Sequence, residues 1–145
     1  MDLLDVNLLV SLAWPNHVHH AAAQAWFRRR AGQPWATTPF TEVGFVRVSA
    51  NASAIPGAVK PVEALALLKR MRELAGHHLL PDDVSLVVGD HLSPERVTTY
   101  RQVTDAHMVA VARRHGARLV TFDRGVGALA RGRDVELVPF LGTGS

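Results

Sequence analysis

Four acidic residues stand where this sequence passes from one expected element to the next, and three of them border strongly apolar stretches. Carboxylates at the ends of buried strands and the starts of helices converge at one edge of an α/β sheet. Carboxylates gathered in this way cannot all stay ionised without cations, so the pattern indicates a site for hard divalent metal ions. The four residues are Asp5, Glu42, Asp105 and Asp123.

A site of this kind favours metal-dependent phosphodiester chemistry. Mg²⁺ or Mn²⁺ prefers oxygen ligands in octahedral geometry and keeps several waters. One or two such ions could polarise a phosphoryl oxygen, lower the pKa of a bound water and stabilise the leaving oxygen. The sequence offers no convincing Ser-His-Asp, Cys-His or glycine-rich phosphate-binding motif, so few other catalytic groups are expected.

Short apolar strands that alternate with helices must position these acids. Strands are predicted at 3–5, 35–37, 77–80, 118–122 and 135–138. Helices are predicted at 21–31, 94–100 and 104–115, with a helix or turn at 6–13 and at 125–129. Residues 86–88 are compatible with either a strand or a helix. This order predicts an α/β fold with a mostly parallel sheet.

Two further helices are defined by their ends. Thr38 followed by Pro39 is typical of an N-cap and a first helical position, and this helix carries Glu42. Another helix begins at Lys60-Pro61 and ends at Gly76, and its expected apolar stripe contains four residues. They are Val62, Leu65, Leu68 and Leu74.

The predicted topology places the four acids at one edge of the sheet. Asp5 and Asp123 directly follow apolar strands, and the carboxyl ends of parallel strands meet at the same edge. Glu42 and Asp105 lie in the first turns of helices, which strand-to-helix connections bring to that edge. Each acid also has an ordinary structural interpretation: a helix cap, a partner for the helix dipole, a solvated side chain or a turn residue.

The composition bounds the class of protein. With 145 residues, the chain suits one domain, expected to span 1–140, with 141–145 as a disordered tail. There is no cysteine, which excludes disulfides and thiolate metal sites. The N-terminus lacks the pattern of a signal peptide and no apolar stretch could span a bilayer, so a cytoplasmic protein with no membrane partner is expected.

Arginine supplies nearly all the positive charge of the chain, whose formal net charge is +3. Arginine makes planar, bidentate contacts to phosphate, so clusters at 28–30, at 113–114 and at Arg131 with Arg133 fit a nucleic-acid partner. Arginines on solvated helix faces explain the clusters equally well.

Four segments in order resemble the PIN-domain ribonuclease toxins of the VapC type. They are residues 4–10, 41–47, 104–112 and 119–125, and together the resemblance covers nearly the whole chain, from residue 3 to about 138. It implies a PIN-like α/β/α sandwich with a mostly parallel central sheet of four to five short strands. It also implies the toxin of a type II toxin–antitoxin system, an endoribonuclease that depends on Mg²⁺ or Mn²⁺.

The resemblance assigns roles to particular residues and partners. Asp5 and Asp105 match metal ligands, Glu42 completes the cluster, and Asp123 acts through metal-bound water. Thr121 fits a hydroxyl sometimes found near the site. The implied partners are the RNA substrate, a cognate VapB-type antitoxin that blocks the site, operator DNA reached only through the antitoxin complex, and a second copy in a homodimer.

Several other side chains have two interpretations. Arg47 and Arg124 could contact RNA or an antitoxin acid, or could be exposed or carboxylate-paired arginines. His17, His19 and His20 suggest a zinc site, but surface and helix-start histidines explain them better. The three tryptophans are expected in the core or a dimer interface rather than stacked on bases. They are Trp14, Trp26 and Trp35.

Other classes of protein fit the acidic pattern less well. A phosphoacceptor receiver domain needs a lysine near the end of a late strand, but Lys60 and Lys69 are the only lysines. A haloacid-dehalogenase-type phosphatase needs Asp-x-Asp, and Asn7 stands in the second position. The alternative from another class is a non-catalytic RNA- or protein-binding module of the same fold.

Overall fold

A single parallel sheet forms the centre of the computed structural model, which describes residues 1–89, 94–130 and 132–140. All neighbouring strands pair in parallel, in the order β3-β2-β1-β4-β5. The prediction of an α/β fold with a mostly parallel sheet of four to five strands is therefore confirmed. The strands are β1 (Asp2–Leu4), β2 (Trp35–Thr37), β3 (His77–Leu79), β4 (Arg118–Thr121) and β5 (Val135–Leu137).

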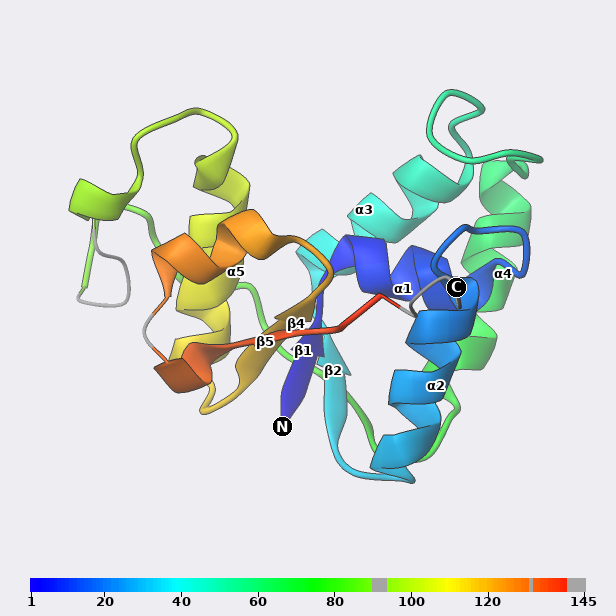
Figure 1. Cartoon of the computed structure of the whole chain (residues 1–145), viewed down its shortest axis with the longest axis horizontal. Helices are drawn as coiled ribbons and strands as arrows, with labels where there is room; N and C mark the ends of the chain where they lie inside the picture. The colour runs from blue at the N-terminus through cyan, green and yellow to red at the C-terminus, as the bar shows by residue number, and fades with distance from the viewer. Residues whose placement is uncertain (90–93, 131, 141–145) are drawn as a thin grey trace, which may run out of the picture.

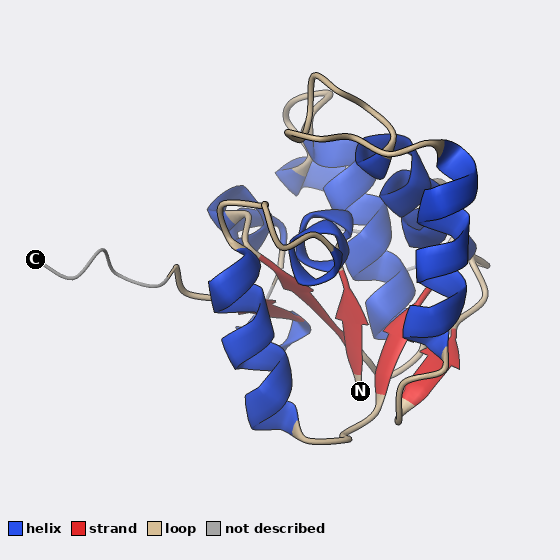
Figure 2. Ribbon diagram, turned by 90° about the vertical axis from the view of Figure 1, so that its right-hand side faces the viewer, coloured by secondary structure: helices blue, strands red, loops and turns tan. Residues whose placement is uncertain are grey.

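Helices cover both faces of this sheet (Figures 1 and 2). Figure 1 shows α5 on one side and α1, α2 and α4 on the other. The helices are α1 (Val6–Ala13), α2 (His20–Arg30), α3 (Pro39–Ser49), α4 (Pro61–Arg72) and α5 (Gln102–Arg114). Short 3₁₀ turns are η1 (Pro94–Arg96), η2 (Arg124–Leu129) and η3 (Gly132–Asp134).

Alternating side chains of the strands divide the core into two layers. Leu4 and Val120 pair across β1 and β4 and pack with α1, α2, α3 and α4. Leu3 and Leu119 pair one position earlier and pack with α5 on the opposite face. This period of two, with apolar residues on both faces, is typical of a parallel strand buried on both sides. The α/β/α sandwich is therefore confirmed.

The first turns of α3 and α5 differ in how well the sequence predicts them. Thr38 caps α3 in a reciprocal capping box with Thr41, and Pro39 follows it, as predicted. The predicted start of α5 at Thr104 is wrong, because the helix begins at Gln102. The Gln102 side chain accepts the backbone N–H groups of Thr98 and Thr99 at 2.8 and 3.2 Å, which stabilises the turn before the helix.

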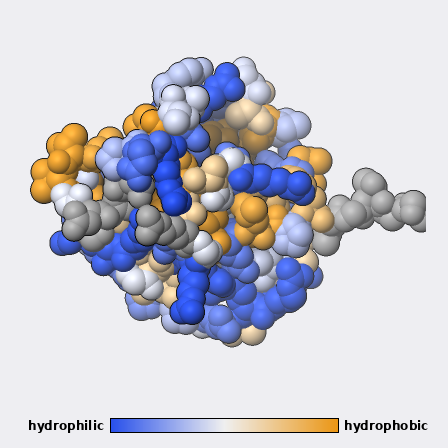
Figure 3. Space-filling view, turned by 60° about the vertical axis from the view of Figure 1, so that its left-hand side comes forward, coloured by the Kyte–Doolittle hydropathy of each residue, from blue (hydrophilic) through white to orange (hydrophobic). Residues whose placement is uncertain are grey.

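The connection between β3 and α5 has less regular structure than predicted. The helix predicted at 94–100 is only the single turn η1. Residues 86–88 lie in exposed bends, neither strand nor helix. The face in Figure 3 shows hydrophilic and hydrophobic side chains mixed over the surface. The predictions for Arg131 and for a tail at 141–145 fall outside the described residues.

The predicted apolar stripe of α4 is largely wrong. Its buried residues are Ala64, Leu68 and Met71, whereas Val62 and Leu65 are 67% and 55% exposed. The small Ala64 side chain, completely buried, lets α4 pack closely against α3. The larger aliphatic residues are therefore left on the surface, beside the candidate site described below. None of the helices in the described parts of the chain has the length and apolar content to cross a bilayer.

Candidate active site

Asp5 lies at the carboxyl end of β1 and caps α1. Its Oδ1 accepts the backbone N–H of Val6 at 2.7 Å, and its Oδ2 accepts the Thr121 hydroxyl at 2.7 Å. The Asp5 backbone N–H donates to the Val120 carbonyl at 2.9 Å, which continues the β1–β4 pairing by one residue. The capping role proposed from the sequence is therefore real, and the same carboxylate is fixed at the edge of the sheet.

The buried Thr121 hydroxyl connects two of the predicted acids. It donates to Asp5, and it accepts the backbone N–H of Asp123 at 3.0 Å. Asn7 Nδ2 also donates to this hydroxyl at 3.0 Å. Because Thr121 ends β4 and Asn7 lies in the first turn of α1, these hydrogen bonds fix the Asp5 carboxylate from two elements.

Asp123 follows β4 and starts η2. Its carboxylate accepts the backbone N–H of Gly125 at 2.8 Å, so the turn interpretation from the sequence also holds. The residue is exposed, which leaves the carboxylate accessible from solvent.

Asp105 lies in the first turn of α5 and interacts electrostatically with Asp5 and Asp123. Burial, together with the negative charges of Asp5 and Asp123, raises its pKa to about 6. No hydrogen bond reaches the Asp105 carboxylate from the described residues. Burial also raises the pKa of Asp5; the hydrogen bonds from Thr121 and Val6 oppose this shift, and the charge of Asp123 adds to it. The three aspartates therefore form one acidic cluster, made from three elements.

Glu42 lies at the same edge of the sheet, but its carboxylate points toward other partners. Its Oε1 accepts the Thr37 hydroxyl at 2.8 Å and lies 3.4 Å from a guanidinium nitrogen of Arg72. Glu42 is not among the causes of the raised pKa of Asp5 or of Asp105. The structure thus brings three of the four predicted acids together and pairs the fourth with α4.

A close helix contact sets the spacing between Asp5 and Glu42. A Cβ atom at Gly44 would lie 2.6 Å from a methyl carbon of Val6, so only glycine fits at this approach of α3 to α1. Val6 is adjacent to Asp5, and Gly44 is two residues after Glu42. The absence of one side chain therefore determines how near the two acid-bearing helix starts can come.

The donor set of this edge suits a hard divalent cation. It consists of carboxylate oxygens with hydroxyl and amide groups beside them, the ligands that Mg²⁺ and Mn²⁺ prefer. The raised pKa of Asp105 has the charges of Asp5 and Asp123 among its causes and no cationic side chain of the described residues. In the described parts of the chain, no three acidic or histidine side chains lie close enough to hold an ion as they stand. The carboxylates fit a divalent metal ion in charge and in ligand type. Their side chains would have to move closer together to bind it.

The amino end of the sheet holds an acid that the sequence analysis missed. Asp2 is buried in β1 and pairs with Arg30 of α2 and with Arg118 of β4, whose Nε lies 2.6 Å from Asp2 Oδ1. Arg118 also pairs with Glu136 at 3.0 Å, and Arg30 stacks over Trp26. Arg30 is therefore structural, and both proposed interpretations of it, nucleic-acid contact and solvated helix face, are wrong. Arg30 stands one helical turn after Trp26, and this spacing could have predicted the stacking of the two side chains.

The remaining arginines are divided between ion pairs and exposed positions. Arg113 pairs with Asp134, and Arg114 pairs with Asp83. Arg124 is exposed next to Asp123. Arg47 is exposed on α3 and lines a groove of about 380 Å³ with Glu42 and the apolar side chains of α3 and α4.

The histidines and tryptophans make local contacts. Ser11 contacts His17 through its hydroxyl at 3.3 Å, and His20 through its carbonyl at 2.8 Å. His19 stacks on Phe140 and lies tilted against Phe122, and the two phenylalanine rings also stack on each other. The expected core tryptophans are confirmed for two residues: Trp26 and Trp35 are buried. Trp14 is half-buried, stacks on Phe45 and donates to Ser49.

Comparisons with known proteins agree with this architecture. The PIN domain family matches residues 3–132. The chain is 51% identical to Ribonuclease VapC39 of Mycobacterium tuberculosis over 139 residues, 96% of this chain and 98% of the relative. It is also 51% identical to Ribonuclease VapC38 of the same organism, covering 97% of this chain and 100% of the relative. Ribonuclease VapC44 is 34% identical over 88% of this chain and 89% of the relative.

The chain therefore belongs to the PIN-domain family and, within it, to the VapC-type ribonucleases. The resemblance noted from four short segments is confirmed over almost the full length.

Proposed function

We propose that this chain is the toxin of a type II toxin–antitoxin pair and cleaves RNA as a divalent-metal-dependent endoribonuclease. The observation that carries the proposal is the acidic cluster of Asp5, Asp105 and Asp123 at the carboxyl end of the sheet, in which the neighbouring negative charges help to raise the pKa of Asp105. Its position matches the place where ligands bind in open parallel sheets. Similarity to VapC ribonucleases makes RNA the expected substrate.

Each acidic residue has a distinct part in the proposed site. Asp5 and Asp105 would hold the metal, Mg²⁺ or Mn²⁺, and Glu42 would complete the cluster after leaving Arg72. When bound, the ion supplies a Lewis acid and lowers the pKa of an attacking water. Asp123 would act through a water rather than directly. Thr121 would keep the Asp5 carboxylate oriented, as it does here.

We propose that the antitoxin lies over the groove between α3 and α4. Apolar side chains of both helices line this groove, with Val43 and Leu65 more than half exposed, so an uncovered hydrophobic surface adjoins Glu42. Arg47 lines the same groove and could pair with an antitoxin carboxylate or an RNA phosphate. Arg124, beside Asp123, has the same two candidate contacts. A segment bound here would block the acidic edge.

One assay tests the catalytic proposal. Purified protein free of antitoxin is incubated with total RNA in Mg²⁺ or Mn²⁺, with EDTA and the variant Asp5→Asn as controls, and the products are separated on a denaturing gel. We expect cleavage that disappears in both controls. RNA binding without cleavage, unchanged in Asp5→Asn, would instead support a non-catalytic binding module of the same fold.

A growth assay tests the toxin proposal. Induced expression should arrest cells, and co-expression of the cognate antitoxin should restore growth. Harmless expression of folded protein without antitoxin would count against a toxin. We further propose a cytoplasmic homodimer that reaches operator DNA only within the antitoxin complex; light scattering and DNA mobility shifts with and without antitoxin test both points.

A further inference from the structure

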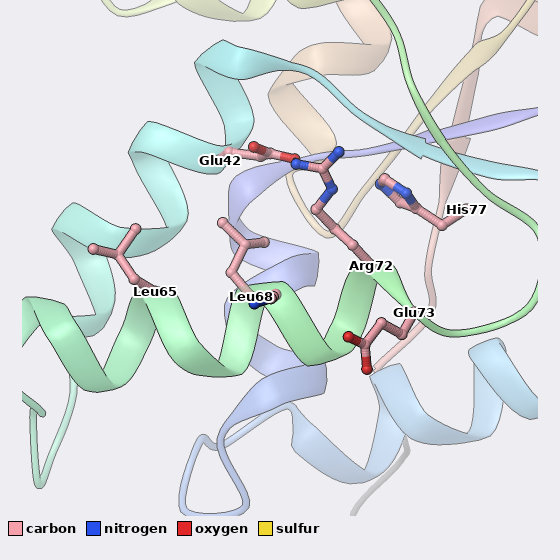
Figure 4. A pocket seen from close by; sticks show the side chains of 7 residues that line it. Glu42, Leu65, Leu68, Arg72, Glu73 and His77 are labelled. Atoms are coloured by element: carbon pink, nitrogen blue, oxygen red, sulfur yellow. The ribbon is translucent and has the colours of Figure 1, made fainter.

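A pocket of about 400 Å³ with charged and apolar side chains in its wall adjoins Glu42 (Figure 4). Glu42 contributes from α3, and most of the wall comes from α4 and the start of β3. The lining residues include Leu68, Lys69, Arg72, Glu73 and His77. Resting on the proposed function, we propose that this pocket binds a backbone phosphate of the RNA next to the cleaved bond, and that Arg72 holds it.

The pocket is connected to the acidic edge through the sheet. His77 on β3 lies 2.8 Å from the Thr37 hydroxyl on β2, and that hydroxyl donates to Glu42. β2 pairs with β1, which leads into Asp5. Neighbouring strands lie about 4.8 Å apart, so β3 is roughly 10 Å from β1 across the sheet, and His77, the first residue of β3, is in register with Trp35 and so with Asp2, at the amino end of β1. A short single-stranded segment of RNA can therefore reach both places.

The Arg72 side chain has donors available for a phosphate. Its ion pair with Glu42 spans 3.4 Å and uses one guanidinium nitrogen, while the side chain is 40% exposed. A guanidinium carries five N–H donors in a planar fork that matches phosphate oxygens. Figure 4 shows the guanidinium reaching between Glu42 and His77. Lys69, one helical turn earlier on α4, is exposed and lines the same pocket.

The charges around the pocket explain why RNA would recruit Arg72. Glu42 and Glu73 balance Lys69 and Arg72 in the present arrangement. If Glu42 turns toward the metal, its charge is neutralised there and Arg72 is left without its partner. An incoming phosphate, which the carboxylates would otherwise repel, can then take the place of Glu42. Arg72 thus exchanges a carboxylate for a phosphate when substrate binds.

The test measures binding of a 5′-labelled, mixed-sequence 12-nucleotide RNA in Ca²⁺, a divalent ion that also takes oxygen ligands, by fluorescence anisotropy at several salt concentrations, with a denaturing gel to confirm that the RNA stays intact. Arg72→Gln should weaken binding about 5- to 20-fold and lower the salt slope by about 0.7, the value for one phosphate contact in single-stranded RNA. Arg72→Lys, which keeps the charge and loses the fork, should fall between. Arg70→Gln is the matched control, an exposed α4 arginine two residues away that does not line the pocket.

Cleavage in Mg²⁺ separates this inference from the proposed function. We expect Arg72→Gln to raise KM more than it lowers kcat. If the unmodified protein cleaves RNA while Arg72→Gln binds with wild-type affinity and slope, the phosphate site is wrong and the nuclease stands. If the protein does not cleave but binding still depends on Arg72, the phosphate site stands and the nuclease is wrong. If Arg72→Gln binds RNA as the wild type does but is no longer inhibited by the antitoxin, the pocket binds the antitoxin. That result would overturn the proposed phosphate site.

Discussion

The two ends of β1 carry an aspartate in opposite electrostatic surroundings. Asp2, at the amino end, is buried and neutralised by Arg30 and Arg118. Asp5, just past the carboxyl end, is fixed by hydrogen bonds and forms no ion pair within the described residues; burial raises its pKa, and the charge of Asp123 adds to this shift. Two acids three residues apart therefore differ in whether the protein itself supplies the cation. The end without an internal cation is the one suited to an external cation.

The largest expected effect is the loss of RNA cleavage when the negative charge of Asp5 is removed. Asp5→Asn keeps the shape of the side chain but removes a negative charge, so we expect cleavage to fall by about 10³-fold or more. The folded protein should be as stable as the wild type or more stable, because a buried, mutually repelling charge is gone. Initial rates on labelled RNA and urea unfolding measure the two quantities. Full activity in this variant would remove Asp5 from the site.

Asp2→Asn should give the opposite result. It leaves the buried guanidinium of Arg30 without a carboxylate, and breaking a buried pair costs about 3–5 kcal/mol of unfolding free energy. Cleavage per folded molecule, measured below the unfolding transition, should stay within about twofold. A stable Asp2→Asn protein with abolished cleavage would contradict the assignment of this end as structural.

Thr121→Val sharpens the comparison by removing only the hydroxyl that orients Asp5. Valine has nearly the same shape, so the loss of hydrogen bonding should cost about 1 kcal/mol in stability. The positioning effect should be larger: kcat should fall about 10- to 100-fold, as for groups that orient metal ligands. Thr121→Ser, which restores the hydroxyl, should recover most of the rate. Equal losses in Val and Ser variants would indicate a packing role instead.

The smallest expected effect is a pH dependence of stability without metal. The pKa of Asp105 rises from an ordinary 3.8 to about 6 in the folded state. Protonation of Asp105 therefore favours folding, and this contribution is present at acid pH and is lost as the pH rises through about 6. Allowing for solvent screening of a partly exposed group, the loss is about 1 kcal/mol.

Urea unfolding of the wild type and Asp105→Asn in EDTA checks this sign. The variant should be the more stable protein above pH 7, and its advantage should shrink toward pH 4. Added Mg²⁺ should stabilise the wild type and erase the difference. A constant difference across the whole range would show that Asp105 titrates normally.

The sequence predicted the fold well because local signals agreed with one another. Apolar runs marked the strands, and the pair Thr38-Pro39 marked the start of α3. The errors have physical causes outside the local sequence. Gln102 starts α5 early through side-chain hydrogen bonds to the preceding turn. The small Ala64 is completely buried on α4, together with Leu68 and Met71, whereas the larger Leu65 lines the open groove.

The sequence was enough to predict where the four acidic residues lie in the fold, but not which side chains they pair with. The strand-to-helix order is enough to place four acids at one edge of the sheet. The partner of each acid depends on side chains that are distant in sequence, such as Arg72 for Glu42 and Arg30 for Asp2. No local pattern in the sequence shows which arginine pairs with which acid, so these partners were identified only from the three-dimensional structure.

Gly44 influences the geometry of this site without belonging to the proposed metal or RNA contacts. Any side chain at that position would meet Val6 and act as a wedge between α1 and α3. The gap between Asp5 and Glu42 would widen while every acid remained in place. A Gly44→Ala variant would therefore keep all four acidic residues and still have lower activity. The presence of the acids alone would overestimate the activity of such a variant.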